Sequence, residues 1–189
     1  WGLANTGTVI LVFGGSQGSA ALNAIIDGWV TRGLPPGVQL IWATGKGNFH
    51  AHVTRESERV RVRPYLSPIS EAYAAADLAI TRAGAMTTAE LVAWGIPPVL
   101  VPLPTAAADH QTINAKALAA AGAARWIRQS ELTVDRLDAL ARELIGTPGA
   151  LDALAAAGRE RARPDAADDI ARRILKSVDL TPDRSSERS

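Results

Sequence analysis

The sequence has no cysteine, few aromatic residues and almost no net charge. The absence of cysteine excludes disulfides and thiol chemistry, and it fits a reducing compartment. The 20 Lys and Arg residues are interleaved with 19 Asp and Glu residues, which leaves a formal net charge of +1. A chain without a basic block lacks the electrostatic footprint of a nucleic-acid-binding protein, so we expect no nucleic-acid partner.

Long apolar segments are also missing. No apolar run approaches the roughly 20 residues that a membrane-spanning helix needs, and the chain shows no signal-peptide pattern. These absences predict a cytoplasmic protein. The sequence begins with Trp1 rather than methionine, so we expect the natural protein to start further upstream.

The length and composition predict one globular domain. The chain has 189 residues, of which 47% are hydrophobic, and this is enough for a single sizeable core. We assign residues 1–179 to that domain. Residues 180–189 are polar and rich in serine and arginine, which predicts a disordered tail.

Apolar runs and amphipathic stretches alternate along the chain. Runs of β-branched and apolar residues predict strands at 8–13, 38–43, 77–81, 98–101 and 124–127, and the alternation of valine and arginine predicts a short strand at 60–63. Helical spacing predicts helices at 19–30, 67–76, 84–94, 110–121, 134–145, 150–161 and 164–175. Strands that alternate with helices through short connections predict an α/β fold with a doubly wound parallel sheet.

The stretch 84–114 carries the clearest functional signal. Gly84 lies at the predicted start of a helix, where free backbone N–H groups and the helix dipole favour a phosphate. Glu90 follows in the same helix, where its carboxylate can accept hydrogen bonds from vicinal ribose hydroxyls. Asp109 is predicted to cap the next helix, and Gln111 lies in the first turn of that helix. Both helices follow parallel strands, whose carboxyl ends bind ligands in open α/β sheets, and this predicts a sugar-nucleotide site.

A glycine-rich turn joins the first strand to the first helix. Strand, glycine turn and helix together form a phosphate-binding arrangement, because glycine lets the backbone approach an anion closely. A hydroxyl and an amide side chain add further hydrogen-bonding groups. The alternative is a tight turn whose glycines serve only the packing of helix against strand. The turn consists of Gly14, Gly15, Ser16, Gln17 and Gly18.

Several residues allow two interpretations. Arg82 is either a charge partner of a diphosphate or a solvated loop arginine. Leu66 either contacts a planar base or, with Tyr65, is an ordinary packing residue. His50 and His52 form an H-x-H pair without a third ligand nearby, so we expect a surface loop rather than a metal site. Four tryptophans lie in apolar contexts and are expected in the core: Trp29, Trp42, Trp94 and Trp126.

Four segments occur in the order and at the spacing typical of the MurG family of glycosyltransferases. They are VFGGSQG at 12–18, RAGAMTTAE at 82–90, GIP at 95–97 and DHQTIN at 109–114. The resemblance extends over most of the chain and is more specific than any single glycine turn. It implies a Rossmann-like domain that forms the C-terminal half of a GT-B glycosyltransferase of family 28.

The resemblance also implies roles for individual residues. It implies that Ser16 contacts the donor diphosphate and that Leu66 contacts the uracil. It also implies that Gln111 binds hydroxyls of the N-acetylglucosamine ring. A six-residue segment is implied to surround the phosphates and the ribose, with its glutamate on the ribose hydroxyls. The segment consists of Ala85, Met86, Thr87, Thr88, Ala89 and Glu90.

Members of that family transfer N-acetylglucosamine from UDP-GlcNAc to lipid I and so make lipid II for peptidoglycan. The resemblance implies an inverting displacement, without a metal or other cofactor in this half. The family's N-terminal domain holds the acceptor site, the catalytic groups and the membrane-facing patch, and it has no counterpart in this sequence. Membrane contact at the cytoplasmic face is therefore implied only through that domain. We expect this chain alone to bind UDP-GlcNAc weakly and to transfer no sugar.

Three alternatives stay open. The first is a related transferase with another nucleotide sugar or lipid acceptor. The second is a UDP-GlcNAc epimerase-type relative, which needs acid and base groups around the sugar, and only Asp109 and His110 qualify. The third is a stand-alone donor-binding subunit, which an exposed apolar face on the last helix would favour.

Overall fold

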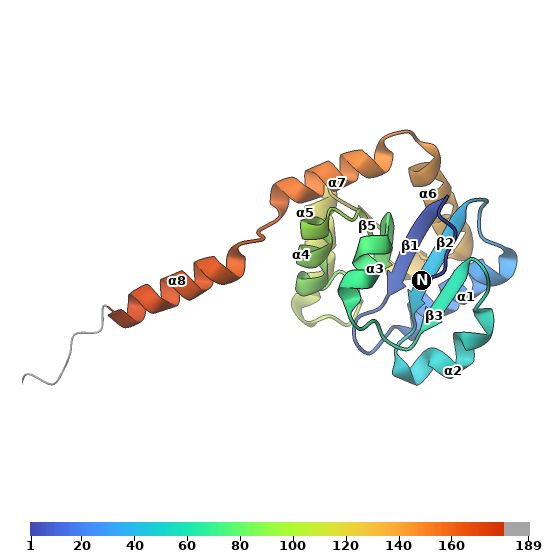
Figure 1. The fold of residues 1–189 in the computed structure, drawn as a ribbon, viewed down its shortest axis with the longest axis horizontal. Helices are drawn as coiled ribbons and strands as arrows, with labels where there is room; N and C mark the ends of the chain where they lie inside the picture. The colour runs from blue at the N-terminus through green and yellow to red at the C-terminus, as the bar shows by residue number, and fades with distance from the viewer. Residues whose placement is uncertain (180–189) are drawn as a thin grey trace, which may run out of the picture.

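The computed structural model describes residues 1–179, which form a six-stranded sheet with helices on both faces (Figure 1). Every pair of neighbouring strands is parallel, and the strand order is β3-β2-β1-β4-β5-β6. The predicted doubly wound parallel sheet is confirmed. The predicted tail at 180–189 lies outside the described residues. The strands are β1 (Thr8–Phe13), β2 (Val38–Ala43), β3 (Val60–Arg63), β4 (Leu78–Thr81), β5 (Pro98–Leu100) and β6 (Arg125–Trp126).

The helices follow the predicted order, and short 3-10 turns precede or follow several of them. The α-helices are α1 (Ala20–Arg32), α2 (Phe49–His52), α3 (Ile69–Ala75), α4 (Ala85–Trp94), α5 (His110–Ala120), α6 (Val134–Gly146), α7 (Ala150–Arg161) and α8 (Ala166–Asp179). The 3-10 turns are η1 (Lys46–Asn48), η2 (Val53–Arg55), η3 (Ala107–Asp109) and η4 (Gln129–Glu131).

Two predicted helix caps are wrong. Pro68, not Ser67, is the residue before α3, and no side chain caps that helix. Asp109 does precede α5, but its backbone is left-handed, with a φ of 52°, and its side chain makes no capping bond. A capping side chain requires an extended backbone at its own position, and the loop before α5 does not provide one.

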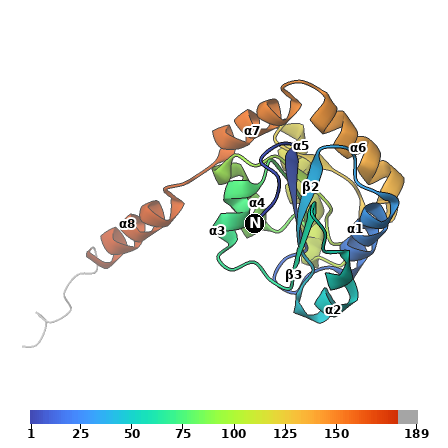
Figure 2. The ribbon, with the colours of Figure 1, turned by 45° about the vertical axis from the view of Figure 1, so that its right-hand side comes forward.

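Alternating residues of the strands build one core on each face of the sheet. Ile10 and Val12 face α1 and α6, whereas Leu11 and Phe13 face α3 and α4. Figure 2 shows the sheet close to edge-on, with α1 and α6 on one side and α3 and α4 on the other. Because both faces are covered, the central strands β1, β4 and β5 read as largely apolar runs in the sequence, whereas the edge strand β3 alternates valine with arginine.

The tryptophan prediction holds for two of the four residues. Trp29 and Trp42 are fully buried, and Trp126 is half-buried. Trp94 is 50% exposed, so its assignment to the core is wrong. It lies at the end of α4, where its ring stands 5.7 Å from that of Tyr73 and leaves its other side to solvent.

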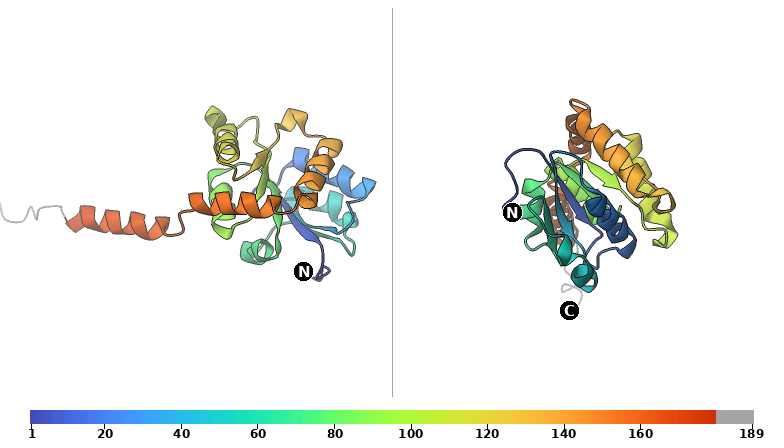
Figure 3. Two further views of the ribbon diagram at one scale, coloured as in Figure 1. Left: turned by 90° about the horizontal axis from the view of Figure 1, so that it is seen from above. Right: turned by 90° about the vertical axis from the view of Figure 1, so that its right-hand side faces the viewer.

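The last helix leaves the body of the molecule. α8 extends away from the sheet and its covering helices (Figure 3). Ile170, Ile174 and Leu175 are each more than half exposed along it. This is the apolar face that a stand-alone subunit or a covering domain would require. None of the helices within residues 1–179 has the length and apolar character needed to cross a bilayer.

Candidate functional site

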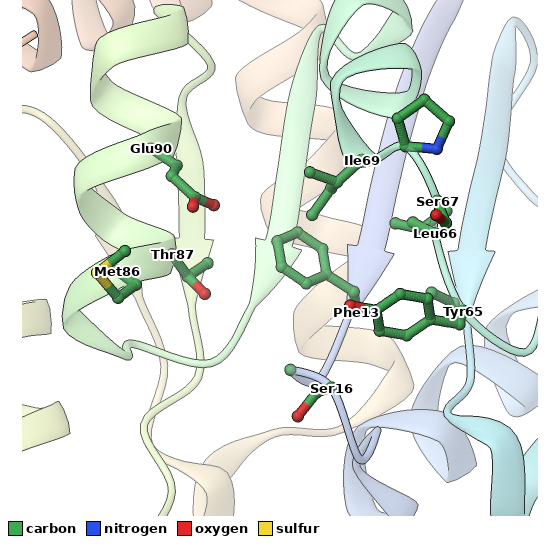
Figure 4. Close-up of a pocket in the computed structure, with 12 residues that line it drawn as sticks. Phe13, Ser16, Tyr65, Leu66, Ser67, Ile69, Met86, Thr87 and Glu90 are labelled. Carbon is green, nitrogen blue, oxygen red and sulfur yellow. The ribbon is translucent and has the colours of Figure 1, made fainter.

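The first of two adjoining cavities lies at the carboxyl edge of the sheet, where the strand order reverses between β1 and β4. It has a volume of about 510 Å³ and is bounded by the end of β1, the segment after β3 and the first turns of α4 (Figure 4). Glu90 and Thr87 point into it from α4, opposite Leu66 and Tyr65. It is lined by Phe13, Gly15, Ser16, Ala43, Tyr65, Leu66, Ser67, Pro68, Ile69, Met86, Thr87 and Glu90.

The second cavity has a volume of about 410 Å³ and shares Gly15 and Thr87 with the first. The two hollows therefore meet at the glycine turn and the start of α4. This is the topological switch point, where doubly wound sheets bind ligands. The second cavity is lined by Gly14, Gly15, Gly18, Ser19, Ala20, Ala21, Arg82, Gly84, Thr87, Leu103, Gln111 and Gln129.

The glycine turn is held in place by backbone packing. Gly18 donates a backbone hydrogen bond to Gly15 at 3.0 Å. A Cβ atom at Gly18 would lie 2.1 Å from the Thr44 carbonyl oxygen, whereas one at Gly15 would meet nothing within 4 Å. Gly18 is thus required for packing, as the alternative interpretation of the turn proposed. Gly15 instead leaves space open beside the cavities.

The start of α4 offers free backbone donors. No side chain caps this helix, so the N–H groups of Ala85, Met86 and Thr87 have no helical partner. A Cβ atom at Gly84, the residue before the helix, would meet nothing within 4 Å. Thr88 is buried, and its hydroxyl lies 3.1 Å from the Gly84 carbonyl oxygen and 3.0 Å from that of Ala85. It therefore stabilises the first turn from within.

The structure brings most predicted site residues together, but not all. Ser16, Leu66 and Glu90 line the first cavity, and Gln111 lines the second. Met86 and Thr87 also line the first cavity. Gln17 is exposed and lines neither. The side chains of three others line a different hollow, between α4 and α5: Ala85, Thr88 and Ala89.

Tyr73 contacts the predicted site residue Glu90, and the sequence analysis missed this contact. Its hydroxyl donates to Glu90 Oε2 at 2.7 Å. Burial, assisted by this hydrogen bond and by the carboxylate charge, raises the pKa of Tyr73 well above its usual value. The phenol therefore stays protonated and acts as a donor. Since the two residues lie on different helices, no local pattern signals the contact.

Gln111 has a double role in the second cavity. Its Oε1 accepts from the backbone N–H groups of Ala83, at 3.2 Å, and Leu103, at 3.0 Å. Both partners are donors, so the amide oxygen must face them, and the NH₂ group remains for the cavity. Asn114 adds a bond from Nδ2 to the Ala83 carbonyl at 3.1 Å. These contacts connect the ends of β4 and β5.

Arg82 is buried, so its interpretation as a solvated loop residue is wrong. One guanidinium nitrogen donates to the carbonyls of Val101 and Pro102, at 3.0 and 3.2 Å. The other donates to Ser19 Oγ at 2.6 Å and to Gln129 Oε1 at 2.7 Å. Burial lowers the pKa of Arg82, but an arginine remains charged in proteins. The second cavity therefore has a fixed positive charge in its wall.

The histidine pair lies elsewhere, beside α1. His52 is partly buried, with its ring 4.8 Å from that of Trp42 and its Nδ1 3.2 Å from Asp27 Oδ1. Arg55 also binds Asp27, and its hydrogen bond is the main cause that lowers the pKa of that carboxyl. Both histidines lie on the short helix α2, so the expected loop is wrong, although His50 is exposed as expected. Within residues 1–179 no three His, Cys, Asp or Glu side chains come together as a metal site.

Known proteins resemble this chain closely in sequence and in fold. Residues 9–170 match the glycosyltransferase family 28 C-terminal domain. The UDP-N-acetylglucosamine--N-acetylmuramyl-(pentapeptide) pyrophosphoryl-undecaprenol N-acetylglucosamine transferase of Salinibacter ruber is 45% identical over 177 residues. That match covers 92% of this chain and 47% of the relative, so the chain spans about half the length of the curated relatives it matches.

Solved structures agree. MurG of Acinetobacter baumannii superimposes with a TM-score of 0.81 and 34% identity, over 92% of this chain and 53% of that one. The UDP-GlcNAc 2-epimerase of Neisseria meningitidis, at 13% identity and a TM-score of 0.63 over 93% of this chain and 46% of that one, shares the fold alone. The match over residues 9–170 shows that this chain belongs to glycosyltransferase family 28 and carries its C-terminal domain.

Proposed function

We propose that this chain is the donor-binding half of a MurG-type transferase, which converts lipid I to lipid II in peptidoglycan synthesis with UDP-GlcNAc as the donor. One observation carries the proposal. Two cavities meet at the glycine turn and at the uncapped start of α4, so a diphosphate there would join a nucleoside in one cavity to a sugar in the other. The name of the Salinibacter ruber relative supports the choice of sugar and acceptor.

The proposed donor lies across the switch point. The uracil packs on Leu66, and Glu90 accepts hydrogen bonds from the ribose hydroxyls. The diphosphate binds between Ser16 and the free N–H groups of residues 85–87, and the sugar occupies the second cavity beside the NH₂ group of Gln111. Thr88 and Ala89 support α4 from its other face. The phosphate loop is supported by Gly14, Gly15, Gln17, Gly18 and Gly84.

In the proposed reaction the acceptor hydroxyl attacks the anomeric carbon, and UDP leaves with inversion. Negative charge develops on the leaving diphosphate. We propose that the three free backbone donors and the positive dipole end at the start of α4 stabilise this charge. The buried guanidinium of Arg82 adds positive charge in the wall of the second cavity. The chain's own groups thus supply the stabilisation of the leaving group, and we propose that this half uses no cofactor.

The acceptor half is the proposed partner of this chain. We propose that it contains the lipid I site and the base, that it covers the apolar face of α8, and that it binds the cytoplasmic face of the membrane. The exposed Ile170, Ile174 and Leu175 support a covering domain. The epimerase alternative has less support, because Asp109 and His110 line neither of the two cavities.

Glu90→Ala should weaken UDP-GlcNAc and UDP alike, by about tenfold or more, because both ligands lose hydrogen bonds to a charged carboxylate. Calorimetric titration of the chain with each ligand measures this loss. A Glu90→Ala chain that binds both ligands as well as the unaltered chain does would contradict the proposal, as would an unaltered chain that binds neither.

Titration of a Gln111→Glu chain with UDP-GlcNAc and with UDP tests whether the sugar lies beside Gln111. This change keeps an acceptor oxygen for Ala83 and Leu103 but removes the NH₂ donor. The added charge acts on the diphosphate of both ligands, so the informative quantity is the ratio of their affinities. We expect the preference for UDP-GlcNAc over UDP to fall about threefold or more. An unchanged ratio would place the sugar outside the second cavity.

A further inference from the structure

Tyr73 is a buried residue of α3 that lies behind the first cavity and does not line it. It is 3% exposed. Its ring stands 6.3 Å from that of Phe13 and 5.7 Å from that of Trp94, measured between centroids. Packing on these rings fixes the position of the hydroxyl, which lies 2.7 Å from Glu90 Oε2.

This contact leaves the other half of the Glu90 carboxylate available. Among residues 1–179, Tyr73 is the hydrogen-bond partner of that carboxylate, and no Lys, Arg or His forms an ion pair with it. Glu90 lines the cavity and its side chain points into it (Figure 4). With Oε2 bound by the phenol, Oε1 is the oxygen left to accept from a ligand.

A carboxylate that is fixed before the ligand arrives binds more tightly than a mobile one. Glutamate loses rotamer freedom when it is ordered, and the Tyr73 bond removes part of that cost in advance. The gain applies only to a ligand that donates hydrogen bonds to Glu90. A nucleotide whose sugar lacks the 2′ and 3′ hydroxyls gains no affinity from the fixed carboxylate.

We infer that Tyr73 is a positioning residue that makes the site selective for ribonucleotide over deoxyribonucleotide donors, because its hydroxyl fixes the Glu90 carboxylate toward the ribose. This inference rests on the proposed function, which places the ribose at Glu90. Tyr73 does not line the cavity, so its effect is confined to the part of the affinity that depends on the sugar hydroxyls.

The test compares UDP with 2′,3′-dideoxyuridine 5′-diphosphate, which lacks both hydroxyls, by calorimetry on the unaltered chain and on Tyr73→Phe. The unaltered chain should prefer UDP by about tenfold or more, since the analogue forfeits hydrogen bonds to a charged group. In Tyr73→Phe that preference should fall about threefold or more, while affinity for the dideoxy analogue stays within about twofold. The phenylalanine ring keeps the packing against Phe13 and Trp94.

Two further variants separate positioning from general loosening. Thr133→Ala removes a hydrogen bond outside both cavities, the cap of α6, and should leave the ratio of the two affinities unchanged. In a Glu90→Ala background, Tyr73→Phe should have no further effect on the ratio.

An equal loss of both ligands in Tyr73→Phe would show a structural role and overturn the inference, with the proposed function intact. An unaltered chain that binds UDP without preferring it to the analogue would also overturn it. Failure of UDP to bind the unaltered chain at all would overturn both the inference and the proposed function.

Discussion

Gly18→Ala should lower the free energy of unfolding by about 2–5 kcal/mol. Two costs add to each other, because alanine is strained in a left-handed backbone conformation and its Cβ atom would clash with a neighbouring carbonyl. Gly18 has a φ of +76°, and its added Cβ would lie 2.1 Å from the Thr44 carbonyl oxygen and 2.7 Å from the carbonyl carbon. Neither atom belongs to a flexible side chain, so the turn itself must move. UDP affinity should therefore fall at least about tenfold. Chemical denaturation and calorimetry measure the two effects.

Gly15→Ala is the matched control. Gly15 also has a positive φ, of +88°, but its added Cβ would meet nothing within 4 Å. Only the conformational strain remains, so the loss of stability should be about 1–2 kcal/mol. Equal losses for the two variants would show that the contact between the glycine turn and the segment after β2 does not constrain the loop.

Arg82→Met should lower the free energy of unfolding by about 2–4 kcal/mol, because it leaves buried acceptors without a donor. The groups affected are the carbonyls of Val101 and Pro102 and the side chains of Ser19 and Gln129. The variant also removes the positive charge from the second cavity. Affinity for UDP should fall about tenfold, equivalent to about 1.4 kcal/mol, with a weaker dependence on salt than in the unaltered chain.

Arg82→Lys distinguishes charge from geometry. Lysine keeps the positive charge but lacks the planar fork that reaches several acceptors at once. We therefore expect most of the stability loss to persist and most of the nucleotide affinity to return. Thermal unfolding measures the stability of the two variants, and titration with UDP measures their nucleotide affinity. If lysine did not restore the affinity for UDP, the charge of Arg82 would have no role in anion binding.

The sheet could be predicted because its strands carry the signal in their own residues. β1 and β2 are mostly apolar, with Gln39 as a buried polar exception in β2, and the fold buries both faces of each strand. Gly84 and Glu90 could be placed at one edge of the sheet because parallel strands end together. The glycine turn at 14–18 could be recognised from its residues. Its packing against Thr44 could not, because Thr44 follows β2 and lies more than 20 residues further along the chain.

The remaining features depend on contacts between distant elements. Tyr73 and Glu90 are 17 residues apart on two helices, and their hydrogen bond follows from how those helices pack. The burial of Arg82 depends on Ser19 and Gln129, which lie 63 and 47 residues from it. The expected caps at Ser67 and Asp109 failed because the neighbouring loops decide the backbone angles at those positions.

A crystal structure of the chain with UDP-GlcNAc would show directly where the donor binds. We expect uracil against Leu66, ribose at Glu90, diphosphate between Ser16 and the first turn of α4, and the sugar beside Gln111. Nucleotide bound instead at the opposite edge of the sheet, in the hollow lined by residues such as Asp77 and Arg159, with both switch-point cavities empty, would contradict this placement.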